Sequence, residues 1–304
     1  MKQLVRAALR QLGLQVTRVP SSVSDLEAEF VQTGRIPWSP GYKQAKERFI
    51  GQVLGEPRLL QLFSRQSRLP RHFGVGFDER CVEYPWLVAH LQSRHENLLD
   101  AGSALNHAFI LEQPVFEKKK LHILTLAPES NCFWQKGISY LFHDLRSVPI
   151  RDEYFDAIVC LSTLEHVGCD NTAYTRQAVY REHRSDDFIL ALQELSRILK
   201  PEGTLFLTVP FGVYRHFGSF QQFDQKLLSR AIDAFGKTDA VATFYRYSDT
   251  GWDVANIEDC TNAEYVEWVA KVWSDGQWPE PLPEEPDGAA AARCVACVKL
   301  TKTR

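Results

Sequence analysis

The stretch Asn97-Leu-Leu-Asp100-Ala-Gly102-Ser103 opens the part of the chain that decides the fold. It is an apolar run of strand length that breaks at an acidic residue followed by a glycine, a pattern typical of the first strand and loop of a doubly wound sheet. Working outward, similar apolar runs cover residues 121–126, 138–142, 155–161 and 204–209, and an amphipathic helix is predicted over about 186–199. Strands that alternate with helices predict an α/β protein with a parallel sheet.

Acidic residues follow two of these runs. Glu129 lies in the turn after 121–126, and Asp144 follows 138–142. Because ligands of parallel sheets bind beyond the carboxyl ends of the strands, we expect these carboxylates to face one cleft and to accept hydrogen bonds from a nucleoside. The sequence therefore predicts a nucleotide-type cofactor site along one edge of the sheet.

The order of these motifs resembles the class I S-adenosylmethionine-dependent methyltransferases from Asn97 to the C-terminus. The segments that carry the resemblance are Asp100-Ala-Gly102-Ser-Ala-Leu-Asn106, Val148-Pro149-Ile150, Tyr154-Phe155-Asp156, Leu164-Glu165-His166-Val167 and Leu199-Lys200-Pro201-Glu-Gly203-Thr-Leu205-Phe-Leu207-Thr-Val-Pro210. The resemblance implies a Rossmann-like sheet of seven strands with helices on both faces, whose last strand is antiparallel. It also implies S-adenosylmethionine as cofactor, bound by Asp100, Gly102, Ser103, Asn106, Glu129, Asp144, Leu145 and Leu161.

Two positions depart from the family pattern. The second glycine of the first loop is replaced by Ala104 or Leu105, and the acidic residue at the tip of the second strand is replaced by Ala127, with Glu129 as its expected substitute. Such a degenerate loop is also what a non-catalytic relative would show. A nicotinamide-dependent oxidoreductase is disfavoured, because the sequence lacks G-x-G-x-x-G after the first strand and an acidic residue ending the second.

The loops after the fourth and fifth strands are rich in polar and aromatic residues. We expect them to bind the substrate, with Tyr174, Arg176, Tyr214 and Arg215 as the candidate contacts. The insertion at about 168–184 resembles the same region of methyltransferase-like proteins of polysaccharide biosynthesis.

Methyl transfer to a hydroxyl group calls for a general base near neutrality, and His166 and His216 are the candidates. A divalent ion on Glu165, Asp170 and Asn171 is an alternative, but the spacing of these oxygen ligands is not diagnostic, so no metal is predicted.

Composition restricts the class of protein. The chain has 304 residues, 44% of them hydrophobic and 24% charged, with a net charge of −3, so it is an ordinary globular protein without the basic field that nucleic acid requires. Seven cysteines and the lack of a secretory signal predict a cytoplasmic protein. Cys294-Val-Ala-Cys297 has CxxC spacing but lies in a strand-like segment without a second pair, which favours buried structural cysteines.

Residues 1–90 are predicted to form a helical extension to a methyltransferase-like domain at 91–304. Residues 1–19 have the pattern of a basic amphipathic helix, either docked on the domain or bound peripherally to an anionic membrane at the inner face. A helical pattern continues over 42–65, and 68–85 is interpreted as a loop that reaches the active site or as a solvated connector.

The C-terminal third is predicted to complete the sheet. A helix over 219–235 and a strand over 240–247 precede a capping box, Thr261-Asn-Ala-Glu264, that would open a helix through Trp273. The segment 279–286 is predicted to be an exposed loop before a final strand over 292–300.

These features predict a methyltransferase acting on a small molecule or glycan, with O-methylation favoured. N-methylation of an amino sugar is a close variant, and a catalytically silent binding or scaffold protein in cell-surface glycan assembly is the alternative. The acceptor and the oligomeric state remain open.

Overall fold

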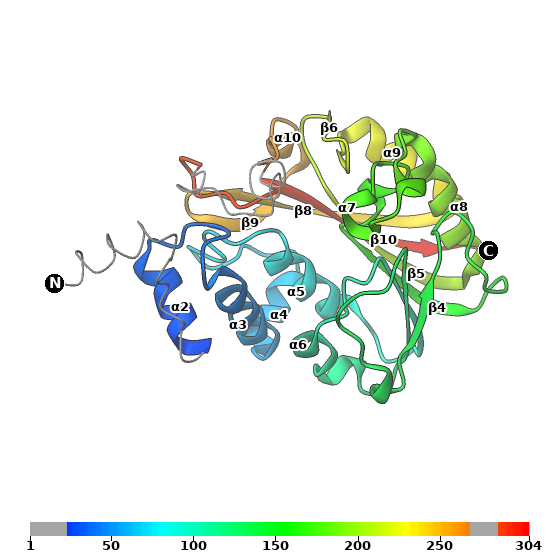
Figure 1. Ribbon diagram of the computed structural model, residues 1–304, viewed down its shortest axis with the longest axis horizontal. Helices are drawn as coiled ribbons and strands as arrows, with labels where there is room; N and C mark the ends of the chain where they lie inside the picture. Colours follow the sequence, from blue (N-terminus) through cyan, green and yellow to red (C-terminus); the bar gives the residue numbers. More distant parts are fainter. Residues whose placement is uncertain (1–22, 268–284, 304) are drawn as a thin grey trace, which may run out of the picture.

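The computed structural model describes residues 23–267 and 285–303, and its centre is a twisted sheet (Figure 1). Within these residues the sheet has eight strands in the order β3-β2-β1-β4-β5-β10-β8-β9. The strands are β1 (Asn97–Ala101), β2 (Lys120–Thr125), β3 (Ser139–Phe142), β4 (Phe155–Leu161), β5 (Leu199–Pro210), β8 (Thr238–Ser248), β9 (Gly251–Ala255) and β10 (Cys294–Lys302). Strands β1 to β5 are parallel to one another, whereas β10 pairs antiparallel with both β5 and β8.

Helices cover both faces of the sheet (Figure 1). On one face lie α2 (Val23–Gln32), α3 (Tyr42–Leu54), α4 (Pro57–Ser64), α5 (Arg80–His90) and the short α6 (Ala108–Leu111). The other face is covered by α8 (Phe188–Ile198) and α9 (Gln225–Phe235). In β4, Ala157 and Val159 pack under the first group, while Ile158 and Cys160 pack under the second. A strand buried on both faces has to be apolar throughout, which explains the continuous hydrophobic runs of the sequence.

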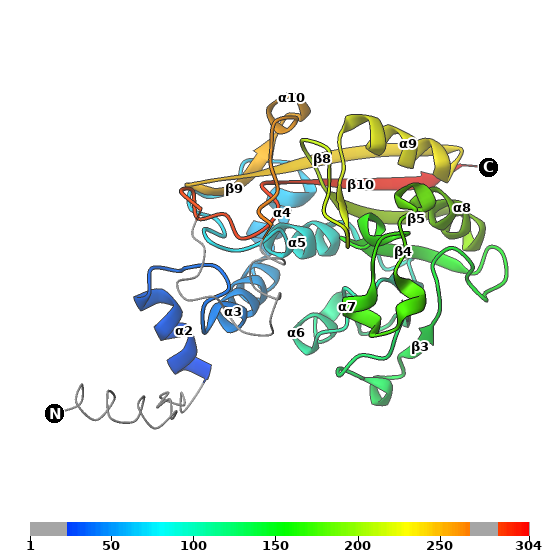
Figure 2. The ribbon, with the colours of Figure 1, turned by 45° about the horizontal axis from the view of Figure 1, so that its top comes forward.

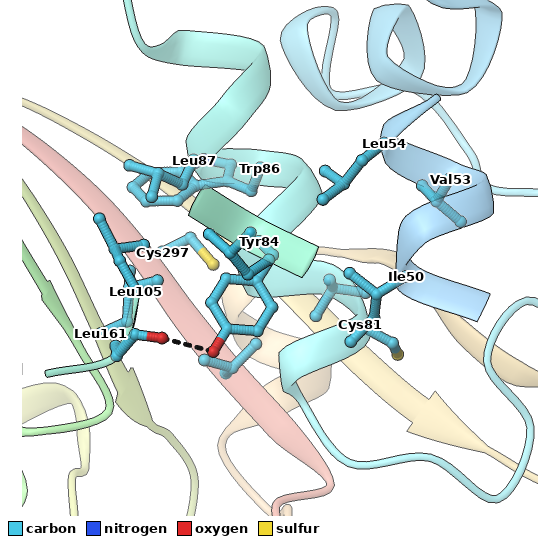
Figure 3. Packing of buried hydrophobic residues seen from close by; sticks show 14 of the residues in the cluster. Ile50, Val53, Leu54, Cys81, Tyr84, Trp86, Leu87, Leu105, Leu161 and Cys297 are labelled. Atoms are coloured by element: carbon cyan, nitrogen blue, oxygen red, sulfur yellow. Dashed lines mark hydrogen bonds between the residues drawn. The ribbon is translucent and has the colours of Figure 1, made fainter. Parts of the chain in front are cut away.

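The helices before β1 share a core with the sheet. Figure 3 shows Tyr84 of α5 between Ile50 of α3 on one side and Leu105, Leu161 and Cys297 on the other. The predicted boundary at residue 90 therefore does not separate two hydrophobic cores. The predicted helix over residues 1–19 lies outside the described residues.

Several predicted elements differ from the structure. The described sheet has eight strands rather than seven, because β9 forms a hairpin with β8 beyond the expected edge. Gly251 begins β9 with φ +93°, and a Cβ there would meet the carbonyl oxygen of Phe73 at 2.3 Å. The close approach of the 68–73 segment to this strand thus depends on a glycine.

The predicted helix over 261–273 is wrong where it can be examined, since residues 261–267 are not helical and the short α10 (Ile257–Cys260) precedes them. The Ala263 carbonyl accepts hydrogen bonds from the Val213 amide and from Gln222 Nε2, so tertiary contacts use a group that a helix would need. The predicted helix over 219–235 begins only at Gln225, capped by Asp224, and Gln221–Gln222 form β7, which pairs with β6 (Arg215–His216).

Cys294 and Cys297 lie on opposite faces of the sheet. Both are free and fully buried in β10, where Cys294 belongs to the core under α8 and α9 and Cys297 to the core under α3 and α5. The two thiols cannot meet, because side chains three residues apart on a strand point in opposite directions. The prediction that these two cysteines are buried is confirmed.

Candidate functional site

A pocket of about 410 Å³ opens at the carboxyl ends of β1 to β4. Its walls come from the loops after these strands, from Arg80 of α5 and from α7 (Thr172–Thr175), and Figure 2 shows α5 and α7 beside this edge of the sheet. The volume lies within the range of small-molecule sites. Of the predicted site residues, Gly102, Glu129, Asp144, Leu145, His166 and Tyr174 line it.

Asp100 shapes the first loop from beneath. Its side chain is fully buried and accepts hydrogen bonds from the backbone amides of Ala104 (3.1 Å) and Leu105 (2.7 Å). Burial raises its pKa to about 7 against the opposing effect of these two bonds. Asp100 was predicted to contact the cofactor; the structure instead shows it bracing the loop that borders the pocket.

The residues that replace the second glycine do not enter the pocket. Ala104 and Leu105 belong to the core under α3 and α5, and neither is among the residues that line the described pocket. Gly102, which does line it, has φ +121°, and a Cβ there would approach the Thr163 side chain to 2.1 Å. The loop therefore keeps the one glycine that its geometry requires.

Glu129 occupies the place expected of the acidic residue after β2. Its Oε2 accepts hydrogen bonds from Ser103 Oγ (2.9 Å) and Asn106 Nδ2 (3.0 Å), while the carboxylate lines the pocket. Ser103 and Asn106 are themselves buried and stand behind Glu129 rather than in the pocket wall. Both residues were predicted as direct contacts, and the structure makes them the support of a carboxylate.

Asp144 follows β3 and is paired with Arg146. The Asp144 carboxylate accepts bonds from Arg146 Nε at 2.9 Å and from Nη2 at 2.6 Å. Burial acts to raise the pKa of Asp144, but the Arg146 hydrogen bonds lower it below its ordinary value, so the group is ionised at neutral pH. The same guanidinium contacts Glu182 and Asp187, which ties the loop after β3 to the insertion at 168–187.

His166 has the hydrogen bonding of a base. It lies in the single turn Leu164–His166 after β4, and its Nδ1 is 2.7 Å from the Ser219 carbonyl oxygen. Because a carbonyl only accepts, Nδ1 carries the proton. Burial lowers the pKa of His166 to about 4, so the ring is neutral at pH 7 and Nε2 keeps its lone pair. Tyr174 packs edge-on against the ring, with the centroids 5.5 Å apart.

His216 does not reach the pocket. It lies exposed on β6, where its Nδ1 accepts the Gly218 amide proton at 3.0 Å. The neutral ring therefore carries its proton on Nε2, which lies 3.6 Å from Cys169 Sγ. Both nitrogens are engaged outside the described pocket lining, so the structure does not bring His216, the other predicted base, into this site.

The other predicted contacts are dispersed. Arg176, Tyr214 and Arg215 are exposed and lie outside the described pocket lining, and Arg215 pairs with Glu267 at 3.2 Å. Leu161 is fully buried in the core, so its side chain does not reach a ligand. Only Tyr174 of the predicted substrate contacts borders the pocket, because α7 holds it beside His166.

The oxygen ligands of the alternative metal site do not converge. Glu165 is 3% exposed and its Oε2 has no hydrogen-bond partner, while Asp170 Oδ1 is bonded to Thr172. Asn171 donates its amide hydrogens to the carbonyls of His166 and Cys169. Residues 23–267 and 285–303 contain no group of three His, Cys, Asp or Glu side chains placed to hold a metal ion.

Arg80 is the pocket residue that the sequence did not indicate. The segment 68–85 was interpreted as a loop or connector, but Arg80 begins α5 and lines the pocket. The helical pattern of apolar residues from Cys81 to Leu87 was the available signal, and Pro85 within it obscured the helix. Glu83, one turn along, was missed for the same reason.

Known proteins resemble this chain in the region of the pocket. Residues 123–207 match the family model described as a methyltransferase domain. Solved structures with a similar fold include a putative sarcosine dimethylglycine methyltransferase from Galdieria sulphuraria, with 15% identity, coverage of 73% of this chain and 85% of the other, and a TM-score of 0.44. The N-methyltransferase NodS from Bradyrhizobium japonicum has 13% identity, coverage of 84% and 98%, and a TM-score of 0.41. No curated protein sequence matches the chain.

The strand order and the pocket at the carboxyl ends of β1 to β4 define an α/β protein of the Rossmann-like class. Residues 123–207 match a methyltransferase domain, as the resemblance to the class I S-adenosylmethionine-dependent methyltransferase superfamily predicts. The cofactor of that superfamily is S-adenosylmethionine. The residues of the pocket fit its chemistry, since two carboxylates, Glu129 and Asp144, face the cavity and neither replacement of the second glycine enters it.

Proposed function

We propose that the protein transfers a methyl group from S-adenosylmethionine to a hydroxyl group of a small molecule or glycan. The observation that carries this proposal is His166, a neutral imidazole in the pocket wall whose Nδ1–H is held by the Ser219 carbonyl and whose Nε2 is unprotonated. A sugar hydroxyl has to lose its proton as the new bond to carbon forms, and Nε2 can accept it. No other histidine that was predicted as a base lies in this wall.

The cofactor would lie along the pocket, with Asp144 and Leu145 at its adenine and Glu129 at its ribose. Bound there, it supplies an electrophilic methyl group on a positively charged sulfur. Glu129 accepts hydrogen bonds from ribose hydroxyls, and Ser103 and Asn106 hold its carboxylate in place. Tyr174, packed against His166, positions the acceptor next to Nε2.

N-methylation of an amino sugar is the variant that the same site supports. A neutral amine needs no proton removed before it attacks, so the role of His166 would then be to accept the proton released afterwards. Loss of kcat in a His166 variant is expected to be larger for a hydroxyl acceptor than for an amine.

Calorimetric titration with S-adenosylmethionine and S-adenosylhomocysteine tests the cofactor site. We expect binding by the native protein and at least about tenfold weaker binding by Asp144→Ala, since the group that would accept the adenine amine is lost. Binding would justify screening nucleotide sugars and glycans as acceptors. If the native protein binds neither compound, the enzyme proposal is wrong and the alternative, a silent scaffold in glycan assembly, is favoured.

A peripheral membrane contact through residues 1–19 stays a prediction, because those residues are outside the described part of the chain. A cytoplasmic location also stays a prediction. In that part, none of the helices combines the length and the apolar character needed to cross a bilayer. The net charge of −3 supports a small-molecule or glycan acceptor over nucleic acid.

A further inference from the structure

Arg80 is a partly buried cation at the end of the pocket opposite Asp144. Its side chain is 25% exposed and lines the pocket together with Gly102 and Thr163. Its Nη1 donates to Glu83 Oε2 at 3.0 Å and to the Leu161 carbonyl oxygen at 3.2 Å. Within residues 23–267 and 285–303, Nε and Nη2 have no hydrogen-bond partner. The Nε–Nη2 edge of a guanidinium is a fork that matches a carboxylate.

Glu83 holds Arg80 in this position. Its side chain is fully buried, and its Oε1 accepts hydrogen bonds from the hydroxyls of Ser162, at 2.6 Å, and Thr208. These partners come from the end of β4 and from β5, so one carboxylate joins α5 to the two central strands. Burial acts to lower the pKa of Arg80, but the negative charge of Glu83 raises it, and the guanidinium remains charged.

Ser162 is held in a strained conformation beside this pair. Its φ is +39°, a region that non-glycine residues rarely occupy, and its amide donates to both the carbonyl oxygen (3.1 Å) and Oγ1 (2.9 Å) of Thr208. Such strain persists only where surrounding bonds impose it, and it is concentrated at functional sites. The network therefore keeps the end of β4 and Arg80 in one arrangement.

Three backbone amides of the first loop are already bonded within the protein. In many anion sites backbone amides supply the hydrogen bonds, but here the amides of Ala104 and Leu105 are taken by Asp100, and the Gly102 amide is bonded to the Leu124 carbonyl. Arg80 is the charged donor that borders the same part of the pocket. A ligand carboxylate at this end would therefore bind to Arg80 of α5 rather than to these loop amides.

We propose that Arg80 binds the carboxylate of the methionine moiety of the cofactor, and that Glu83 is the positioning residue that aims it. The proposal rests on the proposed function. It assigns to α5, a helix in the segment before the predicted domain boundary, one of the contacts that complete the site. The strand order β3-β2-β1-β4 places Asp144, Glu129 and Gly102 in succession along the pocket, and Arg80 follows them because it is bonded to the Leu161 carbonyl at the end of β4. This order supports the methionine end as the source of the carboxylate.

The test compares two ligands that differ by that carboxylate alone, S-adenosylmethionine and its decarboxylated form, by calorimetry. The native protein should bind S-adenosylmethionine more tightly, and Arg80→Gln should weaken its binding by about tenfold to hundredfold while leaving the decarboxylated compound within about twofold. Arg94→Gln is the matched control, because Arg94 is exposed beside the amino end of β1, opposite the pocket. The control should bind both ligands as the native protein does.

A second pair of variants separates positioning from folding. Glu83→Gln should weaken S-adenosylmethionine binding selectively, because an amide hydrogen would then face the Arg80 guanidinium, and thermal unfolding should show that the protein remains folded. In the double variant with Arg80→Gln, the effect of Glu83→Gln on this ligand should disappear.

The outcomes are distinguishable from failure of the proposed function. If the native protein binds neither ligand, the proposed function fails. If it binds both with equal affinity, or if Arg80→Gln leaves S-adenosylmethionine binding unchanged, the function survives and the assignment of Arg80 is overturned. A turnover defect in Arg80→Gln with unchanged cofactor affinity would likewise overturn it, and would assign the guanidinium to the acceptor.

Discussion

Two histidines that look equivalent in the sequence differ in what their Nδ1 atoms meet. At His166 a carbonyl oxygen lies 2.7 Å from Nδ1, which leaves Nε2 as the acceptor. At His216 a backbone amide donates to Nδ1, which leaves Nε2 as the donor. The tautomer, and with it the capacity to act as a base, is therefore decided by a backbone partner, which is 53 residues away for His166 and 2 residues away for His216.

His166→Gln tests the base directly. We expect kcat to fall by about 10²- to 10⁴-fold with an acceptor found by screening, while S-adenosylhomocysteine affinity changes by less than about twofold. Since the pKa of His166 is lowered to about 4, activity should not fall between pH 8 and pH 5 through this group. His183→Gln, at an exposed position in the neighbouring loop, is the control, and an equal loss in both variants would contradict the assignment.

Asp100 should make stability depend on pH. Its folded-state pKa of about 7 lies above its ordinary value of 3.8. The contribution of Asp100 to the free energy of unfolding is therefore largest below pH 3.8 and is lost as the pH rises toward 7. The difference in unfolding free energy between Asp100→Asn and the native protein should shift by about 3 kcal/mol in favour of the variant from pH 4 to pH 7. Denaturant unfolding at several pH values measures this, and a difference independent of pH would show that Asp100 is ionised throughout.

At the scale of elements, Arg146 links the loop after β3 to the insertion at 168–187. Its guanidinium lies 2.6 Å from Asp144, 2.9 Å from Glu182 and 2.6 Å from Asp187. These charges are mostly shielded from water, because the Arg146 side chain is 15% exposed. One largely buried cation therefore ties the insertion to the loop after β3.

Arg146→Gln should release the insertion, since three carboxylates would lose their shared partner. We expect trypsin to cleave at Arg176, Arg181 or Arg184 about fivefold faster or more, as the open form becomes more populated. Limited proteolysis followed by mass spectrometry measures the rate. Arg230→Gln is the matched control, because the ion pair of Arg230 with Asp186 is exposed and its other contact is with the Phe188 ring. Equal rates in both variants would show that Arg146 does not hold the insertion.

The molecule as a whole should unfold as one unit, because one core joins α3 and α5 to β1, β2, β4 and β10. Leu87→Ala removes a fully buried side chain of α5, and we expect it to lower the free energy of unfolding by about 2 to 5 kcal/mol in a single transition. Circular dichroism and tryptophan fluorescence should report the same midpoint.

The control for this prediction is Leu190→Ala, since Leu190 is 48% exposed on α8 and should change stability little. Two transitions in Leu87→Ala, with the later one unshifted, would instead establish that the predicted extension at 1–90 folds separately from the domain at 91–304.

The parallel strands, the order of the loops and the carboxylates at their ends could be predicted from the sequence, because a strand buried on both faces is apolar throughout and polar residues begin where it ends. The turn with Glu129 and the antiparallel last strand followed from the same pattern and the family resemblance. These are local properties, carried by residues adjacent in the chain.

Which of those residues face the pocket depends on contacts between distant parts of the chain. Asp100 lies beneath the loop because it accepts hydrogen bonds from two loop amides. His216 lies outside the pocket lining, where the Gly218 amide donates to it. Arg80 lines the pocket because Glu83 joins α5 to β4 and β5. Glu83 and Thr208 are 125 residues apart, and no local pattern records such a bond. Partners distant in the sequence determine the protonation state and the orientation of the side chains in the pocket, and the chemistry of the site depends on both.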